Sequence, residues 1–217
     1  MTKLDDSYKN KGARKKLVEL LTSKGITDKA VLNAMLKIPR HYFFNKTFES
    51  HAYEDKAFPI GEGQTISQPY TVAYQTQLLQ VRKGDKILEI GTGSGYQAAV
   101  LCELGASLYS IERHEKLSKA ALLMLQQLGY KATLMHGDGT KGWAEHAPYD
   151  KIIVTAGAPV IPKQLAAQLN IGGLLVIPVG DDKVQKMITV VRKSEKSFEK
   201  IVLDEFKFVP LIGENGW

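Results

Sequence analysis

Cysteine is scarce in this chain of 217 residues. Cys102 has no second cysteine to pair with, so no internal disulfide can form, and its apolar neighbours at 98–101 indicate a buried small hydrophobic side chain. The sequence also lacks the run of roughly 18 apolar residues that a membrane span needs, and its polar beginning has no signal-peptide core. These absences predict a cytoplasmic protein that binds no membrane.

Spacing typical of a metal site is missing as well. The five histidines are scattered at positions 41, 51, 114, 136 and 146. Zinc sites bring histidines and cysteines together at short, regular spacings, which these positions do not show. We therefore expect no metal cofactor.

Acidic residues are too few to balance the basic ones, which leaves a formal net charge of +6. Near the start of the chain, Asp5 and Asp6 are outnumbered by the basic residues Lys3, Lys9, Lys11, Arg14, Lys15 and Lys16. Aromatic residues do not alternate with them, as they would on a surface for single-stranded nucleic acid. The segment is interpreted as a solvated helix face, so we expect no nucleic-acid partner, while a general attraction for acidic substrates stays open.

A strand, a glycine-rich turn and a helix follow one another in the middle of the chain. Residues 86–90 are mostly apolar, Gly91, Gly93 and Gly95 come next, and residues 97–104 have a helical pattern. Glycine permits a tight turn and lets a ligand approach the backbone. The free N–H groups at a helix start carry partial positive charge. This combination predicts a nucleotide site.

The spacing of the glycines indicates which nucleotide is bound. The dinucleotide motif would require glycine at position 96, where Tyr96 stands. Here an acidic residue precedes three alternating glycines, a pattern that resembles the first motif of the class I S-adenosylmethionine-dependent methyltransferases. The resemblance implies S-adenosyl-L-methionine as cofactor. The residues expected to bind it in this segment are Glu89, Gly91, Thr92, Gly93, Ser94 and Gly95.

Strand-like and helical stretches alternate along the second half of the chain. The predicted strands are 86–90, 107–112, 132–136, 151–155 and 173–179, with helices at 115–128 and 162–169. Such alternation predicts a parallel sheet covered by helices. Two further strand-like runs, 187–193 and 200–208, are too close together for a helix between them. The expected fold is α/β and Rossmann-like: a mostly parallel seven-stranded sheet with a C-terminal antiparallel hairpin, as in the class I methyltransferases.

A helical extension is expected ahead of this sheet. Leucines at helical spacing predict a helix over 13–24, and Thr27 is expected to cap a second helix that Pro39 ends. Residues 40–70 look irregular, and a loop of this length is usually functional. The expected organisation is one methyltransferase domain over 1–217, with helices and a substrate loop in 1–80 and the cofactor-binding core in 81–217.

Pro69 suits the first turn of a third helix. Ser67 then lies at or next to the N-cap, where backbone donors and a hydroxyl converge on a site suited to a carboxylate.

Several segments carry a narrower resemblance. The most specific is Gly-Gln-Thr-Ile-Ser-Gln-Pro-Tyr at 63–70, and the others lie at 88–97, 109–113, 137–139 and 208–211. In these segments the sequence is similar to the protein-L-isoaspartate (D-aspartate) O-methyltransferases, in order from Arg40 to Leu211. Gly157 departs from the family, which more often has alanine there, and the loss of one methyl group is expected to change little.

The resemblance implies a reaction and its partners. A methyl group passes from S-adenosyl-L-methionine, leaving S-adenosyl-L-homocysteine, to the free α-carboxylate of L-isoaspartyl and D-aspartyl residues in damaged proteins and peptides, which starts their repair. Such a carboxylate, with a pKa near roughly 3.5, is already ionised and needs no general base. Ser67 is expected to orient it as the catalytic residue, in a monomer. The substrate-binding residues expected are Thr65, Ile66, Ser67, Thr155 and Val209.

Acidic residues end two neighbouring predicted strands, and ligands of open α/β sheets bind beyond such strand ends. Glu112 is expected to accept hydrogen bonds from both ribose hydroxyls. Asp138, followed by Gly139, is expected to meet the adenine amino group. Glu112 could instead pair with Arg113 or Lys116, and Gly-Asp-Gly is also a common turn sequence.

Two other functions stay open on the sequence alone. The same cofactor could serve an RNA or small-molecule acceptor, against which the lack of an aromatic-Pro-Pro amine site and of a basic aromatic stripe counts. A nucleotide-binding regulator without catalysis is the other.

The chain itself contains a sequence prone to the damage in question. Asn215 is followed by Gly216, which does not hinder succinimide formation. We expect aged protein to accumulate isoaspartate at 215 and fresh enzyme to methylate it, unless Trp217 docks and pins the tail.

Overall fold

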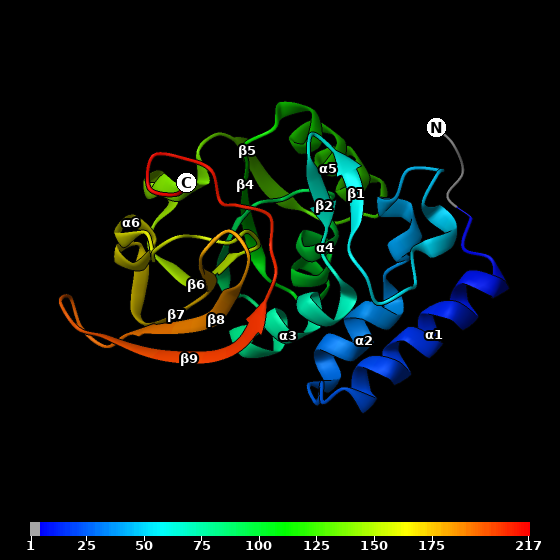
Figure 1. Ribbon diagram of the computed structural model, residues 1–217, viewed down its shortest axis with the longest axis horizontal. Helices are drawn as coiled ribbons and strands as arrows, with labels where there is room; N and C mark the ends of the chain where they lie inside the picture. The colour runs from blue at the N-terminus through cyan, green and yellow to red at the C-terminus, as the bar shows by residue number, and fades with distance from the viewer. Residues whose placement is uncertain (1–4) are drawn as a thin grey trace.

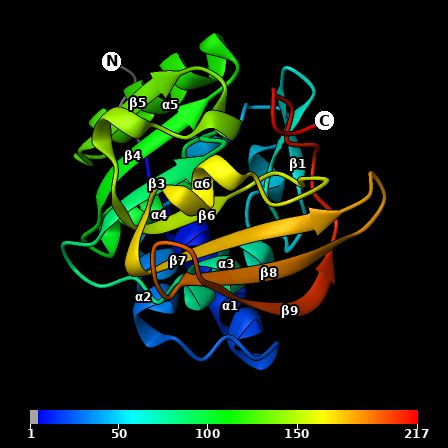
Figure 2. The same cartoon turned by 90° about the vertical axis from the view of Figure 1, so that its left-hand side faces the viewer.

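A seven-stranded sheet dominates the computed structural model, which describes residues 5–217 (Figure 1). Its strands are β3 (Lys86–Ile90), β4 (Ser107–Glu112), β5 (Ala132–His136), β6 (Tyr149–Val154), β7 (Leu169–Gly180), β8 (Gln185–Arg192) and β9 (Phe198–Phe206). Their order in the sheet is β5-β4-β3-β6-β7-β8-β9, with β9 at one edge (Figure 2). The first five are parallel, whereas β8 runs antiparallel to both β7 and β9. The expected parallel sheet and terminal hairpin are confirmed.

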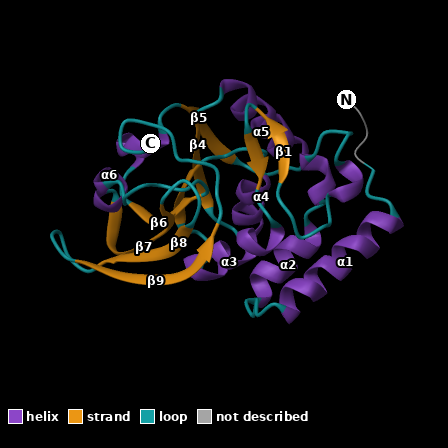
Figure 3. Ribbon diagram, viewed as in Figure 1, coloured by secondary structure: helices purple, strands orange, loops and turns teal. Residues whose placement is uncertain are grey.

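The alternation of side chains along each strand separates two apolar clusters. Ile87 belongs to an apolar cluster that includes side chains of the five helices between Tyr8 and Gln127. Leu88 and Ile90 belong to a second cluster, together with Leu165 of the helix at Lys163–Ala167. Successive residues of a strand point to opposite faces of the sheet. Both faces are therefore covered, which is why the central strands are apolar on each side. Figure 3 shows these layers of helix and strand.

Six α-helices occur among the described residues, and they pack on the sheet or on one another. They are α1 (Tyr8–Ser23), α2 (Lys29–Lys37), α3 (Pro69–Leu79), α4 (Tyr96–Glu103), α5 (Glu115–Gln127) and α6 (Lys163–Ala167). The first begins earlier than expected, and its exposed lysines include Lys9, Lys11, Lys15 and Lys16. The interpretation of this segment as a solvated face is wrong for Arg14, because the Arg14 side chain is buried. Lys3 lies outside the described residues.

The cap of α2 is Asp28 rather than Thr27. The Asp28 carboxylate accepts hydrogen bonds from the backbone N–H groups of Ala30 and Val31. The N–H and hydroxyl of Thr27 both point to Gln77 of α3 instead. Aspartate and threonine are both good caps, so the sequence did not distinguish two neighbouring candidates.

The segment between α2 and α3 is more ordered than the sequence indicated. It contains the short 3₁₀ helices η1 (Arg40–Phe43) and η2 (Glu49–His51), then the antiparallel strands β1 (Phe58–Gly61) and β2 (Gln64–Ile66). Glu62, in the turn between β1 and β2, forms an ion pair with Lys116 of α5 at 3.2 Å. Two smaller 3₁₀ turns, η3 (Gly139–Lys141) and η4 (Ala144–His146), connect β5 to β6.

Cys102 is only half-buried, so it is less enclosed than expected. Its Sγ lies 3.6 Å from the carbonyl oxygen of Lys131, and burial raises the pKa of the thiol to about 12. Within residues 5–217, no helix combines the length and apolarity needed to cross a membrane. No cluster of three His, Cys, Asp or Glu side chains suited to a metal occurs in the same range.

Candidate active site

The glycine turn lies where the strand order of the sheet reverses. β3 is followed along the chain by β4 on one side, and β6 later pairs with its other side. Gly91 leaves β3 with φ of 95° and Thr155 follows β6. The Thr155 hydroxyl donates to the carbonyl oxygen of Gly91 at 2.6 Å. A Cβ on Gly91 would lie 2.5 Å from this hydroxyl, so glycine is required both by the dihedral angle and by the contact.

A pocket opens around this turn, at the carboxyl ends of the strands. Apolar side chains of Ile90, Ile111 and Leu211 line it together with polar groups. The predicted cofactor residues that line it are Gly91, Thr92, Gly93, Ser94, Glu112 and Gly139, whereas Gly95 does not line it. The N–H groups of Gly91, Gly93 and Gly95 are bonded within the protein, whereas the sequence predicts them to be free. The close backbone of the turn, an acidic side chain and apolar walls together still fit a nucleoside cofactor.

Glu112 is held firmly at the edge of this pocket. Its side chain is buried, and its two carboxylate oxygens accept hydrogen bonds from the N–H of Gly93 at 2.7 Å and of His114 at 2.9 Å. Each oxygen keeps a further lone pair for a ligand. Neither Arg113 nor Lys116 is its ion-pair partner; Lys116 pairs with Glu62.

Glu89 lies beneath the turn and does not line the pocket. It is fully buried, and its Oε2 accepts a hydrogen bond from Ser110 Oγ at 2.5 Å. Ser110 Oγ in turn is 2.6 Å from the hydroxyl of Thr92 in the turn. Burial raises the pKa of Glu89 to about 8, and nearby Glu112 adds to the effect. Glu89 therefore supports the glycine turn from below.

Asp138 bonds to the end of the chain rather than facing the pocket. Its Oδ1 accepts from the N–H and hydroxyl of Thr140, and its Oδ2 accepts from the N–H of Glu214 at 2.9 Å. Gly139 lines the pocket, and a Cβ at this position would collide with the side chain of Ile90. The final residues thus lie beside Asp138 and α6 (Figure 1).

A second pocket adjoins the first and is lined by α3, by the end of β9 and by the residues after it. Thr65, Ser67, Thr155 and Val209 line both pockets. Four of the five expected substrate-binding residues therefore form the wall between two cavities. Ile66 is buried and lines only the first pocket.

Ser67 stands next to the N-cap of α3, as expected, but the backbone donors there are not free. The cap residue is Gln68, and it makes no capping hydrogen bond with its side chain. Asp55 takes this role from a distance, accepting from the N–H of Tyr70 at 2.8 Å. Pro69 has no N–H to offer. The Tyr70 N–H is thus taken by a carboxylate of the protein itself, and the hydroxyls of Thr65 and Ser67 are polar groups left on this wall.

Comparison with known proteins decides the family. A family model described as protein-L-isoaspartate(D-aspartate) O-methyltransferase matches residues 12–216. The chain belongs to this family. Among its relatives, a protein-L-isoaspartate O-methyltransferase of Flavobacterium psychrophilum is 60% identical over 210 residues, covering 96% of this chain and 98% of the relative. One of Cytophaga hutchinsonii is 54% identical over 214 residues, covering 99% and 97%.

Solved structures of the family share the fold. One protein-L-isoaspartate O-methyltransferase has a TM-score of 0.84 at 31% identity and covers 94% of this chain and 67% of its own. A Plasmodium falciparum structure, described as a protein-L-isoaspartate O-methyltransferase in complex with S-adenosyl-L-homocysteine, has a TM-score of 0.80 at 26% identity. It covers 92% of this chain and 98% of its own.

Several residues that shape this site escaped the sequence analysis. Asp55 and Arg40 reach the Ser67 segment through tertiary contacts that no local pattern indicates. Trp217 was considered, and its Nε1 indeed donates to the carbonyl oxygen of Gly157 at 3.0 Å. Gly157 is also closer to its surroundings than expected, because an added Cβ would meet the side chain of Gln185 at 2.9 Å.

Proposed function

We propose that this protein transfers a methyl group from S-adenosyl-L-methionine to the free α-carboxylate of L-isoaspartyl and D-aspartyl residues in damaged proteins and peptides, starting their repair. The observation that carries the proposal is the wall of Thr65, Ser67, Thr155 and Val209 between two adjoining pockets. A methyltransferase must bring cofactor and acceptor together from different sides, and family membership identifies the acceptor.

The residues around the first pocket fit the cofactor. The backbone of the glycine turn, the oxygens of Glu112 and the apolar side chains of Ile90 and Ile111 match an amino acid, a ribose and an adenine, respectively. When bound, S-adenosyl-L-methionine supplies an electrophilic methyl group on its sulfonium. We assign Glu112 and the turn residues 91–94 to direct binding, Glu89 and Gly95 to support of the turn, and Gly139 to the adenine end, with Asp138 held beside it.

The second pocket has to orient a nucleophile that is already charged. An α-carboxylate with a pKa near roughly 3.5 needs no base at neutral pH. Correct orientation and exclusion of water are what remain for the protein to provide. The Ser67 hydroxyl is our candidate for holding the carboxylate, because Ser67 lines both pockets and no hydrogen bond to another described residue occupies its hydroxyl. The Thr155 hydroxyl is bound to Gly91, so Thr155 contributes its shape.

The remaining expectations extend this proposal. We propose that residues 1–80 and 81–217 act as one domain, that the protein works as a monomer in the cytoplasm, and that it binds no nucleic acid. Apolar side chains from both segments share one cluster, which supports the first point. A chain with a single cysteine has no internal disulfide that would favour an oxidising compartment.

Methyl transfer to a matched pair of peptides tests the proposal. One peptide contains isoaspartate and its twin contains ordinary aspartate at the same position. We expect label from S-adenosyl-L-methionine in the first and not in the second. Equal labelling of both, or labelling of RNA instead, would refute the assigned acceptor. A thermal shift with NAD or FAD but not with S-adenosyl-L-homocysteine would refute the cofactor.

A further inference from the structure

Arg40 is a fully buried arginine that none of the assignments above uses. It begins η1, and its guanidinium donates through Nε to the carbonyl oxygen of Ala52 and through Nη2 to that of Ser67, each at 2.9 Å. Burying a cation is costly unless its hydrogen bonds and charge are satisfied. The side chain therefore has a particular task in this place, and one of its bonds ends on Ser67.

The same guanidinium also touches the cofactor side of the site. Its central carbon lies 4.6 Å from the centre of the Tyr96 ring and 5.3 Å from that of Phe44. Tyr96 is the first residue of α4, directly after Gly95 of the glycine turn. Arg40 thus connects the segment that carries Ser67 to the helix that starts at the cofactor turn.

Charge gives Arg40 a second role. The Asp55 carboxylate at the start of α3 is nearly buried and would repel an anionic acceptor beside Ser67. Lys24 binds Asp55 at 2.7 Å from the outer side. Burial lowers the pKa of Arg40 to about 10, and the charge of Asp55 partly opposes this. The guanidinium stays protonated at neutral pH and offsets the Asp55 charge from within.

We propose that Arg40 is a positioning residue for methyl transfer, which holds Ser67 in register with the glycine turn through the Ser67 carbonyl and the Tyr96 ring. Arg40 lines neither pocket, so it acts through Ser67 rather than on the acceptor itself. The inference rests on the proposed function. It goes further by naming the contact that aligns the acceptor segment with the cofactor segment.

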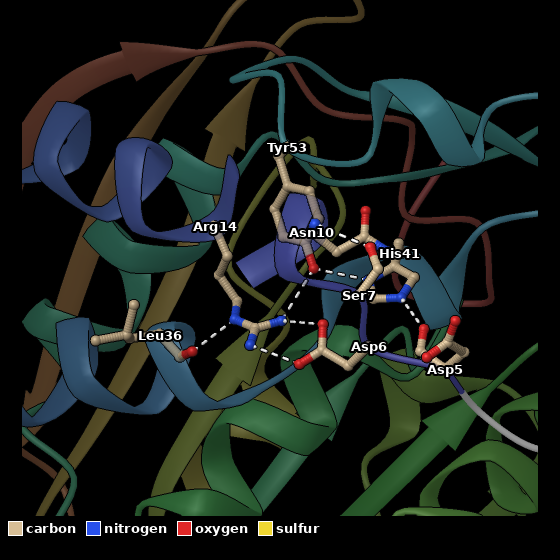
Figure 4. A network of polar contacts seen from close by, with 8 residues as sticks. All are labelled: Asp5, Asp6, Ser7, Asn10, Arg14, Leu36, His41 and Tyr53. Atoms are coloured by element: carbon tan, nitrogen blue, oxygen red, sulfur yellow. Dashed lines mark hydrogen bonds and ion pairs between the residues drawn. The ribbon is translucent and has the colours of Figure 1, made fainter. Parts of the chain in front are cut away.

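The test is Arg40→Lys, with Arg14→Lys as its matched control. Lysine keeps the charge but cannot donate to two carbonyls in the fixed geometry of a guanidinium. Arg14 is a second buried arginine of the same region, bonded to Leu36, Asp6 and Tyr53 and not to Ser67 (Figure 4). Both variants and the wild type are assayed for kcat and KM on an isoaspartyl peptide, for S-adenosyl-L-homocysteine affinity and for Tm.

We expect Arg40→Lys to lower kcat by at least about tenfold, because small misplacements of reacting groups are costly. Its S-adenosyl-L-homocysteine affinity should stay within about twofold of the wild type, as an effect confined to the acceptor side requires. Arg14→Lys should lower Tm by about as much as Arg40→Lys does but leave kcat unchanged. An unchanged kcat in Arg40→Lys, or an equal loss of kcat in both variants, would overturn the positioning role.

Two controls keep the result interpretable. If the wild type itself fails to methylate the peptide, the proposed function is at fault and not the role of Arg40. If Arg40→Lys does not fold, Arg40→Met takes its place, because an apolar side chain of similar length suits a buried position and cannot donate to the Ser67 carbonyl. A fall in kcat at unchanged cofactor affinity then supports the inference, and an unchanged kcat contradicts it.

Discussion

The Ser67 hydroxyl can be removed to test catalysis without a large change in stability. Its hydroxyl makes no hydrogen bond to other described residues, and the cap of α3 is Gln68. We therefore expect Ser67→Ala to lower kcat on an isoaspartyl peptide while the free energy of unfolding changes by less than about 0.5 kcal/mol. Turnover at saturating peptide and urea denaturation are measured together. A stability loss near 1 kcal/mol with full turnover would make Ser67 a structural residue.

Glu112 should matter for the cofactor instead. Replacement by alanine removes a carboxylate that binds the turn through Gly93 and faces the pocket. We expect S-adenosyl-L-homocysteine binding to weaken by about 1.5–3 kcal/mol, the range for hydrogen bonds to a charged group. Calorimetry measures it, with Glu115→Ala on the exposed start of α5 as control. An unchanged affinity would remove Glu112 from the site.

Glu89 makes a prediction about pH. Its pKa rises on folding from 4.5 to about 8, so the folded protein binds a proton there that the unfolded chain has released. The stabilising effect of this proton is complete below about pH 4.5 and is lost as pH rises through about 8. Glu89→Gln cannot titrate, so its stability relative to wild type should increase over this interval, by at most about 1.4 kcal/mol per pH unit. Urea denaturation at pH 5, 6, 7 and 8 tests this, and a constant difference would contradict it.

The glycine turn could be predicted from its residues, whereas Arg40 could not. A required left-handed dihedral angle leaves a local trace in the sequence, because other residues are strained there. An arginine that is buried between two rings looks like any surface arginine until the chain folds. The partner of Asp138 could not be predicted for the same reason, because Glu214 lies far away in the sequence.

At the scale of elements, strands and helices of the sheet were predictable to within a few residues, since buried strands must be apolar and helices must alternate with them. The β1–β2 hairpin and the 3₁₀ turns were missed. They are short, and their order comes from contacts such as that between Phe44 and Phe58 rather than from periodicity.

The start of α3 depends on a cap that is supplied from outside the helix. Asp55→Asn should destabilise the protein by about 1 kcal/mol, because the amide is a weaker acceptor for the Tyr70 N–H and loses the ion pair with Lys24. Asp28→Asn at the local cap of α2 is the control, where asparagine caps nearly as well as aspartate. Equal denaturation midpoints for Asp55→Asn and the wild type would show that α3 needs no such cap.

At the scale of the whole molecule, the C-terminal tail joins elements that are distant in the chain. Trp217 reaches Gly157 after β6, Glu214 reaches Asp138 after β5, and Asn215 reaches Thr140 and α6. The tail was expected to be mobile unless Trp217 pinned it, and the structure shows it pinned. Leu211 and Ile212, which precede it, line the cofactor pocket.

Loosening the tail should expose its Asn-Gly sequence to damage. The Gly216 nitrogen, which would attack the Asn215 side chain, donates to the Gly213 carbonyl at 3.1 Å. Trp217→Phe removes the indole N–H bond of about 1 kcal/mol, so the tail should open about fivefold more often. We expect isoaspartate at 215 to accumulate faster by this factor, measured by peptide mass spectrometry on aged protein. Equal rates in variant and wild type would show that Trp217 does not protect the sequence.

Because of the position of this tail, the rate at which the protein ages chemically should depend on whether its cofactor pocket is occupied. Leu211 and Ile212, which line the cofactor pocket, lead directly into the bonded tail that holds Asn215, so a ligand packed against them should also hold the tail and delay the first deamidation. A molecule that has long been without cofactor would then age faster than its occupied neighbours. Such a molecule would also present its altered terminus to them as a substrate.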